Sequence, residues 1–182
     1  MALTGYRLDI ARAYFNAMGY RLLGLSVGSG ARIHPNVLLR CRRGHGVLGA
    51  RTTIYRDVQV LCTGEGRFRI GTDSHIAPHG YLLIGQSQLE VGDQVAMGPF
   101  CGVFCESNGA KASGMPFFEQ HLQAPVHIGS NVFIGTKVTV LPGSHIEDNV
   151  VVAAHAVVRG RLASGWVYGG TPARALHPIG SR

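Results

Sequence analysis

Aliphatic residues recur at every sixth position between Val126 and Leu162, in the stretch VHIGSNVFIGTKVTVLPGSHIEDNVVVAAHAVVRGRL. The first place of each block of six is occupied by Ile128, Ile134, Val140, Ile146, Val152 and Val158. The fifth place is apolar or small: Val132, Val138, Ser144, Val150, Ala156 and Leu162. A period of six matches neither an amphipathic helix, with a period of about 3.6, nor a simple strand, with a period of about two. It is typical of a parallel β-helix, in which short strands are joined by tight corners.

Residues eighteen positions apart in this stretch are chemically alike. Three blocks of six make one triangular coil, so such residues should stack on neighbouring coils, about 4.8 Å apart as parallel strands are. The matching pairs are Ile128 with Ile146, Asn131 with Asn149, Val132 with Val150, Ile134 with Val152, and His127 with His145. A solenoid needs this matching, because each coil buries its apolar corner only against its neighbours.

Residues 28–105 follow the same pattern less regularly, and residues 106–125 interrupt it. Its phase slips near Arg42–Gly46, Gly64–Phe68 and Leu83–Gln88. We interpret the slips as small insertions at corners, where a solenoid tolerates them. From Glu106 to Ala124 the six-residue phase is lost altogether, and we expect a loop that projects from one corner. Long loops on rigid scaffolds are usually functional.

The N-terminal segment predicts a helix from Tyr6 to Leu25. Its apolar stripe, at spacings of three and four, consists of Leu8, Ala11, Phe15, Met18, Leu22 and Leu25. We expect this stripe to pack across the open end of the coils as a cap. Arg7, Arg12 and Arg21 lie outside the stripe, so the helix can alternatively, or in addition, rest on the inner membrane as a basic amphipathic helix.

The C-terminal segment predicts a second, shorter helix. After an extended piece at Trp166–Gly170, Thr171-Pro172 would open a helix through Leu176, because proline is favoured in the first turn. The chain of 182 residues, 46% of them hydrophobic, is therefore expected to form one all-β domain over residues 1–182. Its parts are an N-terminal helix (1–27), a β-helix (28–162) with its loop (106–125), and a C-terminal extension (163–182).

The charge and the cysteine content indicate which binding partners and which cellular location are expected. The formal charge of +7 favours anionic partners, but the arginines are scattered and no basic run is interleaved with aromatics, which argues against nucleic acid. A phosphate-bearing small molecule or an anionic membrane surface fits as well. The four cysteines form no CxxC pair and no secretory signal precedes them, so we expect reduced thiols and a cytoplasmic location, with contact to the inner membrane face as an option.

The segments IGSNVFIGTKVTVLPGSHIEDNVVVAAHAVV and VYGGTPARAL resemble the C-terminal half of the hexapeptide-repeat acyltransferases, nearest to the galactoside, maltose and polysaccharide O-acetyltransferases. The pieces VGDQVAMGPFCGVF and FFEQ look like the middle section of that family. The resemblance covers about residues 70–176. It implies a left-handed β-helix, a homotrimer with active sites between subunits, acetyl-CoA as donor, and a sugar or glycan as acceptor. It implies no metal.

The resemblance also assigns residues to the donor site. Thr136 and Ala154 match positions that line the channel for the pantetheine arm, where small side chains leave room. Arg174 matches a basic residue that meets the nucleotide phosphates of CoA, and a guanidinium suits phosphate oxygens. For Thr136 and Ala154 ordinary coil packing explains the residues equally well, and Arg174 can also be a solvated arginine.

The catalytic base is the point at which the sequence departs from the family. The family's histidine, which takes the proton from the acceptor hydroxyl, falls on Asn108 here, or on Ser107 if the alignment slips by one, and neither can act as a base. His121, within the loop, and His79, about one coil below its base, are the candidate replacements, although a plain surface or corner histidine is the more common explanation for each. Glu106 is a weaker candidate because a carboxylate is a poor base at neutral pH.

Three functions therefore compete on the sequence alone. The first is O-acetyl transfer from acetyl-CoA to a sugar hydroxyl of a surface polysaccharide or glycoconjugate precursor. The second is a catalytically silent β-helical trimer that acts as a structural or regulatory partner, because Asn108 replaces the family's histidine. The third is a zinc carbonic anhydrase, which also uses left-handed β-helices but needs three histidines around one metal. His127 and His145 supply only two.

Overall fold

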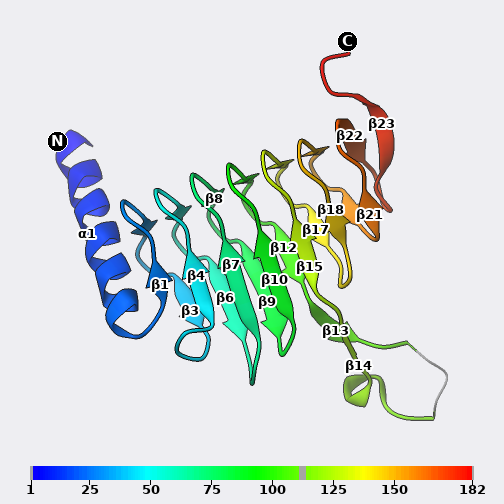
Figure 1. Ribbon diagram of the computed structural model, residues 1–182, viewed down its shortest axis with the longest axis horizontal. Helices are drawn as coiled ribbons and strands as arrows, with labels where there is room; N and C mark the ends of the chain where they lie inside the picture. Colours follow the sequence, from blue (N-terminus) through cyan, green and yellow to red (C-terminus); the bar gives the residue numbers. More distant parts are fainter. Residues whose placement is uncertain (1, 111–113, 182) are drawn as a thin grey trace.

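The computed structural model describes residues 2–110 and 114–181, and it shows a parallel β-helix with a helix across its first coil (Figure 1). Each turn of the chain contributes one short strand to each of three parallel sheets, here named sheets A, B and C. The parallel β-helix predicted from the period of six is confirmed.

The strands of the three sheets follow one another in rotation, except that the last two strands of the chain both belong to sheet B. Sheet A contains β1 (Ser26–Val27), β4 (Gly46–Leu48), β7 (Arg67–Ile70), β10 (Gln88–Val91), β15 (Val126–Ile128), β18 (His145–Ile146) and β21 (Arg161–Leu162). Sheet B contains β2 (Arg32–Ile33), β5 (Thr53–Ile54), β8 (His75–Ile76), β11 (Ala96–Met97), β16 (Phe133–Ile134), β19 (Val151–Val152), β22 (Trp166–Gly169) and β23 (Arg174–Pro178). Sheet C contains β3 (Leu38–Arg40), β6 (Gln59–Cys62), β9 (Tyr81–Gly85), β12 (Gly102–Phe104), β17 (Thr139–Val140) and β20 (Val157–Val158).

The predicted stacking of residues eighteen apart is confirmed where the register is fixed by the sheets. His127 pairs with His145 and Ile128 with Ile146 in sheet A. The two imidazole rings are stacked, with their centroids 4.6 Å apart. At the next corner the side-chain amide of Asn131 donates a hydrogen bond of 2.7 Å to that of Asn149.

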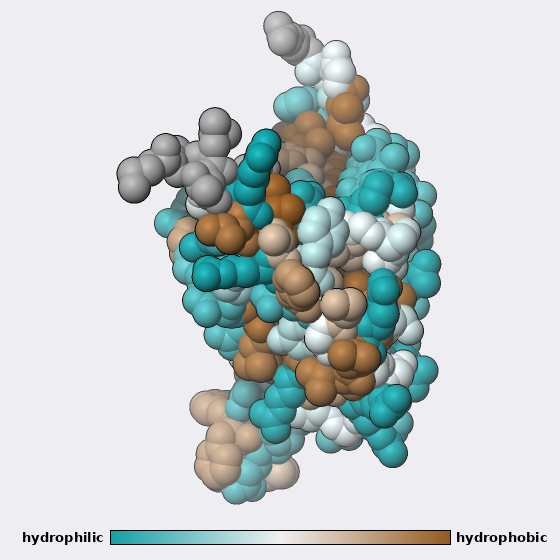
Figure 2. Space-filling view, turned by 90° about the vertical axis from the view of Figure 1, so that its left-hand side faces the viewer, coloured by the Kyte–Doolittle hydropathy of each residue, from teal (hydrophilic) through white to brown (hydrophobic). Residues whose placement is uncertain are grey.

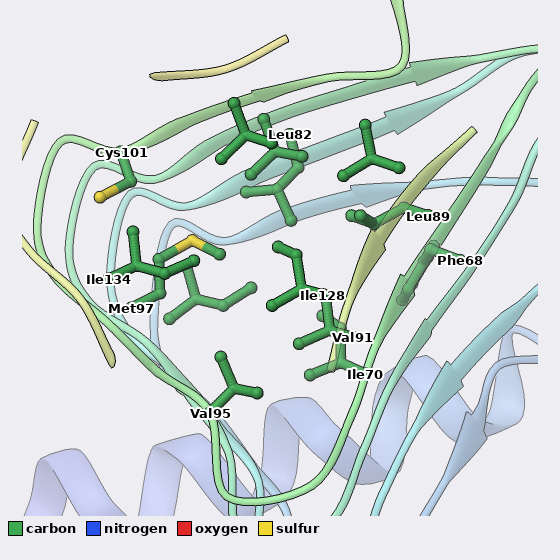
Figure 3. Close-up of a cluster of buried hydrophobic side chains, with 14 of the residues drawn as sticks. Phe68, Ile70, Leu82, Leu89, Val91, Val95, Met97, Cys101, Ile128 and Ile134 are labelled. Atoms are coloured by element: carbon green, nitrogen blue, oxygen red, sulfur yellow. The ribbon is translucent and has the colours of Figure 1, made fainter. Parts of the chain in front are cut away.

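The core fills the inside of the triangular coil. The strands of the coils each turn at least one side chain inward, and Figure 3 shows Ile70, Leu82, Val91, Met97 and Ile134 converging from the three sheets. Because each inward residue touches residues of the coils above and below, the core is continuous along the solenoid.

All the irregularities of the coil lie at the corner that leads from sheet C to sheet A. The three predicted insertions occur there, between β3 and β4, β6 and β7, and β9 and β10. The fourth is the predicted loop, which is more regular than expected. It contains an antiparallel hairpin of β13 (Glu106–Asn108) and β14 (His121–Gln123), with a short 3-10 helix, η1 (Phe117–Glu119), between them.

The helix α1 spans Ala2–Leu22 and lies across the first coil, but the prediction of which face it buries is wrong. Its buried residues are Ala13 and Ala17, whereas the predicted stripe residues Leu8 and Phe15 are exposed, as are Ala11, Met18 and Leu22. The small alanines let the helix approach the coil closely. No helix among the described residues is long and apolar enough to span a membrane.

Hydrogen bonds explain why the polar-looking side of α1 faces the coil. Asn16 donates its side-chain amide to the carbonyl of Ile33 at 3.1 Å, and the Tyr20 hydroxyl donates to the carbonyl of Val37 at 2.7 Å. The first coil has no preceding coil to bond its outward carbonyls, and these side chains satisfy two of them.

The predicted C-terminal helix is also wrong, because the segment forms strand β23. After Gly169 the chain reverses, and Arg174–Pro178 pairs antiparallel with β22. The last coil leaves a row of unpaired backbone groups on its outer side. Pairing with that edge satisfies these groups, which an isolated helical turn would leave exposed.

The two faces of one strand should respond very differently to truncation. In β7, Ile70 is buried and its neighbour Arg69 is exposed. We expect Ile70→Ala to lower the free energy of unfolding by about 2–5 kcal/mol, and Arg69→Ala to change it by no more than about 0.5 kcal/mol. Urea denaturation followed by circular dichroism measures both, and equal losses would contradict the inward and outward assignment.

The cysteines should resist thiol reagents in the folded protein. None of the four forms a disulfide, and burial raises the pKa of Cys62 and of Cys105 to about 12. Since the thiolate is the reactive form, we expect little reaction with a disulfide reagent at pH 8, and reaction of four thiols after unfolding in guanidinium. Any slow native reaction should come from half-buried Cys41 and disappear in Cys41→Ser; rapid native labelling of Cys62 would be inconsistent with this packing.

Candidate functional site

The hairpin β13–β14 presents a polar face at its root. In its register Asn108 lies opposite His121, and Glu106 lies opposite Gln123. Side chains alternate along a strand, so these four share one face, while Ser107 and Leu122 share the other. The family's histidine position and the candidate replacement His121 are therefore direct cross-strand neighbours.

The same face borders an open, polar hollow at the corner between sheets C and A. The hollow is lined by Thr63, Gln86, Glu106, His121 and Gln123. The Gln123 amide donates a hydrogen bond of 3.2 Å to the Glu106 carboxylate, and the His121 side chain is exposed. An imidazole, a carboxylate and amide groups thus meet in one solvent-accessible place.

Two side-chain contacts with the backbone fix the shape of this hollow. The Asn108 amide donates a hydrogen bond of 2.8 Å to the carbonyl of Phe117, which ties η1 to the hairpin. The Glu106 side chain lies over Gly85, where a β-carbon would overlap the carboxylate and where φ is +60°. Gly85 therefore leaves the space that Glu106 occupies.

His79 lies elsewhere, at the corner between sheets B and C. Its backbone is left-handed, with φ 62°, and its ring stacks on Phe100 with the centroids 4.8 Å apart. His79 and His121 belong to different corners of the coil, so they do not form one site within a chain. The sequence places both histidines near the loop along the chain, but it does not show that they lie at different corners.

The corner between sheets B and C also carries the predicted donor residues. Thr136 and Ala154 occupy the same corner position on neighbouring coils, and the Thr136 hydroxyl donates to the carbonyl of Pro99 at 2.9 Å. The backbones are closely stacked here, since a β-carbon on Gly135 would lie 2.6 Å from the nitrogen of Ala154. One step before these residues runs a column of small residues, which consists of Gly98, Gly135, Ala153 and Gly169.

Arg174 lies at the end of that small-residue column. It pairs with Gly169 across β22 and β23, and its side chain is exposed apart from a 3.2 Å hydrogen bond to the carbonyl of Ala173. The structure thus brings Thr136, Ala154 and Arg174 to one corner, although Arg174 stands on a strand where a helix was predicted.

Sheet C separates this corner from the hairpin. Its strand β9 has five residues, which corresponds to roughly 16 Å. The outward residues of sheets B and C include the exposed apolar side chains of Leu38, Tyr81, Phe133 and Trp166, and Phe100 is exposed at the corner between the two sheets. Sheet A instead turns Arg69, Glu90, His127 and His145 outward. In the described part of the chain, no group of three histidine, cysteine or acidic residues gathers closely enough to hold a metal ion.

Comparisons with known proteins support the sequence resemblance. The model of the bacterial transferase hexapeptide (six repeats) matches residues 125–160. A "Probable acetyltransferase" of Mycobacterium tuberculosis is 30% identical over 121 residues, which are 66% of this chain and 40% of that protein. The Escherichia coli "Putative lipopolysaccharide biosynthesis O-acetyl transferase WbbJ" is 34% identical over 103 residues, 56% of this chain and 53% of that protein.

A solved structure shares the fold over most of the chain. AntD, an N-acyltransferase from Bacillus cereus in complex with dTDP and 3-hydroxybutyryl-CoA, superposes with a TM-score of 0.76 at 22% identity, covering 88% of this chain and 87% of that chain. The chain spans about half the length of the curated relatives that it matches. On the coils that carry the repeat, the predicted resemblance to the hexapeptide-repeat transferases is confirmed.

Proposed function

We propose that this protein is an acyltransferase that moves the acetyl group of acetyl-CoA to a sugar hydroxyl of a surface polysaccharide or glycoconjugate precursor in the cytoplasm. The observation that carries the proposal is the position of His121, directly across the hairpin from Asn108. Cross-strand β-carbons are about 5 Å apart, so an imidazole on β14 can serve nearly the same space as one on β13. The name of the E. coli relative supports a sugar acceptor, whereas the name of the N-acyltransferase makes an amino group the alternative acceptor.

His121 acts as the general base in this proposal. Its neutral ring takes the proton from the acceptor hydroxyl as the oxygen attacks the thioester carbonyl. The tetrahedral intermediate collapses, the carbon–sulfur bond breaks, and the proton passes to the leaving thiolate of CoA. Glu106 lines the same hollow, and its negative charge would offset the positive charge that forms on the imidazole.

The small-residue column and Arg174 would hold the donor. A pantetheine arm can lie along Gly135 and Ala153 because these two residues carry no side chain larger than a methyl group. The exposed guanidinium of Arg174 stands at the end of the column, where it can pair with phosphate oxygens of the nucleotide.

A homotrimer would bring base and donor together. Within one chain sheet C keeps them apart, so the hairpin must serve the donor corner of a neighbour. Contacts between two different faces, such as the apolar faces of sheets B and C, close into rings when the rotation allows. We propose a ring of three, in which sheet A stays exposed to solvent.

Replacing the base should abolish transfer without unfolding the protein. We expect His121→Asn to lower kcat by about 10²–10⁴-fold, with the CoA affinity unchanged. The assay follows free CoA released from acetyl-CoA across a panel of sugars and amino sugars. His79→Asn is the matched control and should retain most of the activity.

A swap of the cross-strand pair sharpens the test. In the double variant Asn108→His/His121→Asn the imidazole moves to the opposite strand, and we expect it to recover part of the rate lost in His121→Asn. If His79→Asn alone destroys activity, the base has been assigned to the wrong corner. If the wild-type protein binds CoA but acetylates no acceptor in the panel, the silent-trimer alternative is favoured.

Removing the guanidinium should weaken donor binding selectively. We expect Arg174→Gln to raise the Kd for CoA about ten-fold, equivalent to about 1.4 kcal/mol, because a charge-assisted contact is lost. Isothermal titration calorimetry measures this, and Arg69→Gln, on the opposite face, should leave the Kd unchanged. Equal affinities for wild type and Arg174→Gln would remove Arg174 from the donor site.

A further inference from the structure

The side of α1 that points away from the coils is an apolar stripe with no packing partner among residues 2–110 and 114–181. Its residues are Leu8, Ala11, Phe15, Met18 and Leu22, with Tyr14 and Leu23 beside them. Phe15 is 69% exposed and Leu22 is 80% exposed. We call this stripe the outer face of α1. Figure 2 views the molecule from this end, where apolar and strongly hydrophilic side chains alternate across the surface.

The helix is fixed so that this face cannot turn inward. On its other side, Asn16 and Tyr20 bond to carbonyls of the first coil, and Asp9 forms an ion pair of 2.9 Å with Arg56. Arg21 also donates to the carbonyls of Val27 and Gly28. These contacts hold α1 in one rotation about its own axis, and they leave the stripe exposed.

The net positive charge of the protein is concentrated at the same end. Residues 1–56, which form α1 and the first coils, contain nine arginines, no lysine and a single carboxylate, that of Asp9. That carboxylate is already paired with Arg56. Residues 57–182 contain eight basic and nine acidic residues, so the rest of the chain is close to neutral.

We propose that this end of the solenoid docks on an anionic lipid bilayer. The outer face of α1 enters the boundary between headgroups and acyl chains, as apolar faces of interfacial helices do. Arg7 and Arg12 flank the stripe, are exposed, and meet the lipid phosphates. The surrounding positive potential attracts a negatively charged leaflet from a distance of about one Debye length, roughly 8–10 Å.

The positive charge of this end favours an anionic bilayer over a second copy of the chain, and the apolar stripe favours it over a nucleic acid. A second copy docked end to end would bring two strongly positive ends together, which is repulsive. A nucleic acid would satisfy the arginines but would leave five apolar side chains in water. An anionic bilayer complements both the charge and the apolar stripe.

Vesicle flotation of the full-length protein tests this proposal directly. The probes are vesicles of phosphatidylcholine alone and of phosphatidylcholine with one quarter phosphatidylglycerol. We expect binding to the anionic vesicles at low salt and weaker binding at 0.5 M NaCl. The triple variant Leu8→Ser/Phe15→Ser/Leu22→Ser changes only exposed positions and should reduce binding at least ten-fold, and Arg7→Gln/Arg12→Gln should reduce both the binding and its salt dependence.

Matched controls at other places on the molecule separate docking from general stickiness. Leu176→Ser/Ile179→Ser removes exposed apolar side chains at the opposite end, and Arg69→Gln/Arg159→Gln removes the same amount of charge as the basic variant. Both should bind vesicles like the wild type. Tryptophan fluorescence and urea denaturation confirm that every variant is folded.

Three results would overturn the proposal. The wild type does not float with anionic vesicles, or the triple variant floats as well as the wild type, or light scattering shows that the triple variant is half the mass of the wild type. The last result would mean that a second copy covers the outer face of α1. CoA binding measured on the triple variant and on Arg7→Gln/Arg12→Gln should be unchanged, so failure of docking is distinguishable from failure of the proposed transferase activity.

Discussion

Hydrogen bonding between successive coils is the constraint on which this structure depends. Each strand is only two to five residues long, so no strand is stable alone. The backbone N–H and C=O groups of a strand find their hydrogen-bond partners on the coil above or below. The corner amides follow the same rule: Gly49 donates to Ile70 at 2.7 Å and Gly71 to Val91 at 2.8 Å. The arrangement is repetitive along the axis, and its only open places are the two ends and the corners.

The ends and the corners account for everything in the molecule that is not a coil. At the first end, side chains of α1 bond the carbonyls of Ile33 and Val37; at the last, β23 folds back onto β22. At the corner from sheet C to sheet A the repeat is interrupted by four insertions. The fourth insertion forms the hairpin that carries His121. In the proposed site the rigid coils would supply the donor corner and the irregular hairpin would supply the base. Two kinds of segment therefore divide the work of the proposed site.

The repetitive part of the structure could be predicted from the sequence because an aliphatic residue recurs at every sixth position. The period of six from Ile128 onwards fixed which residues point inward, and the likeness of His127 to His145 fixed the stacking. The pairing of Asn108 with His121 could not be predicted, since it joins residues across an irregular segment that has neither a period nor a recognisable hairpin turn. Glu106–Asn108 is polar throughout, and His121–Gln123 contains a single apolar residue, which is too short a pattern to mark a strand.

The two wrong predictions, at the ends, have one physical origin. A helical stripe of large apolar residues normally identifies the buried face, but α1 meets a surface of exposed carbonyls rather than an apolar groove. Small residues and hydrogen-bond donors, Ala13, Asn16, Ala17 and Tyr20, therefore face the coil. Thr171-Pro172 is a good opening for a helix in isolation. Here the unpaired edge of β22 lies within reach and determines the outcome instead.

The place of the hairpin along the solenoid has a geometric consequence for the acceptor. It leaves the chain between β12 of the fourth coil and β15 of the fifth. With a rise of about 4.8 Å per coil, His121 stands roughly 15–20 Å above the first coil. If α1 rests on a bilayer, the solenoid becomes a spacer of fixed height. A sugar attached directly to a lipid headgroup would then lie too low to reach the hairpin, and the proposed transferase would act only on a glycan long enough to span that height.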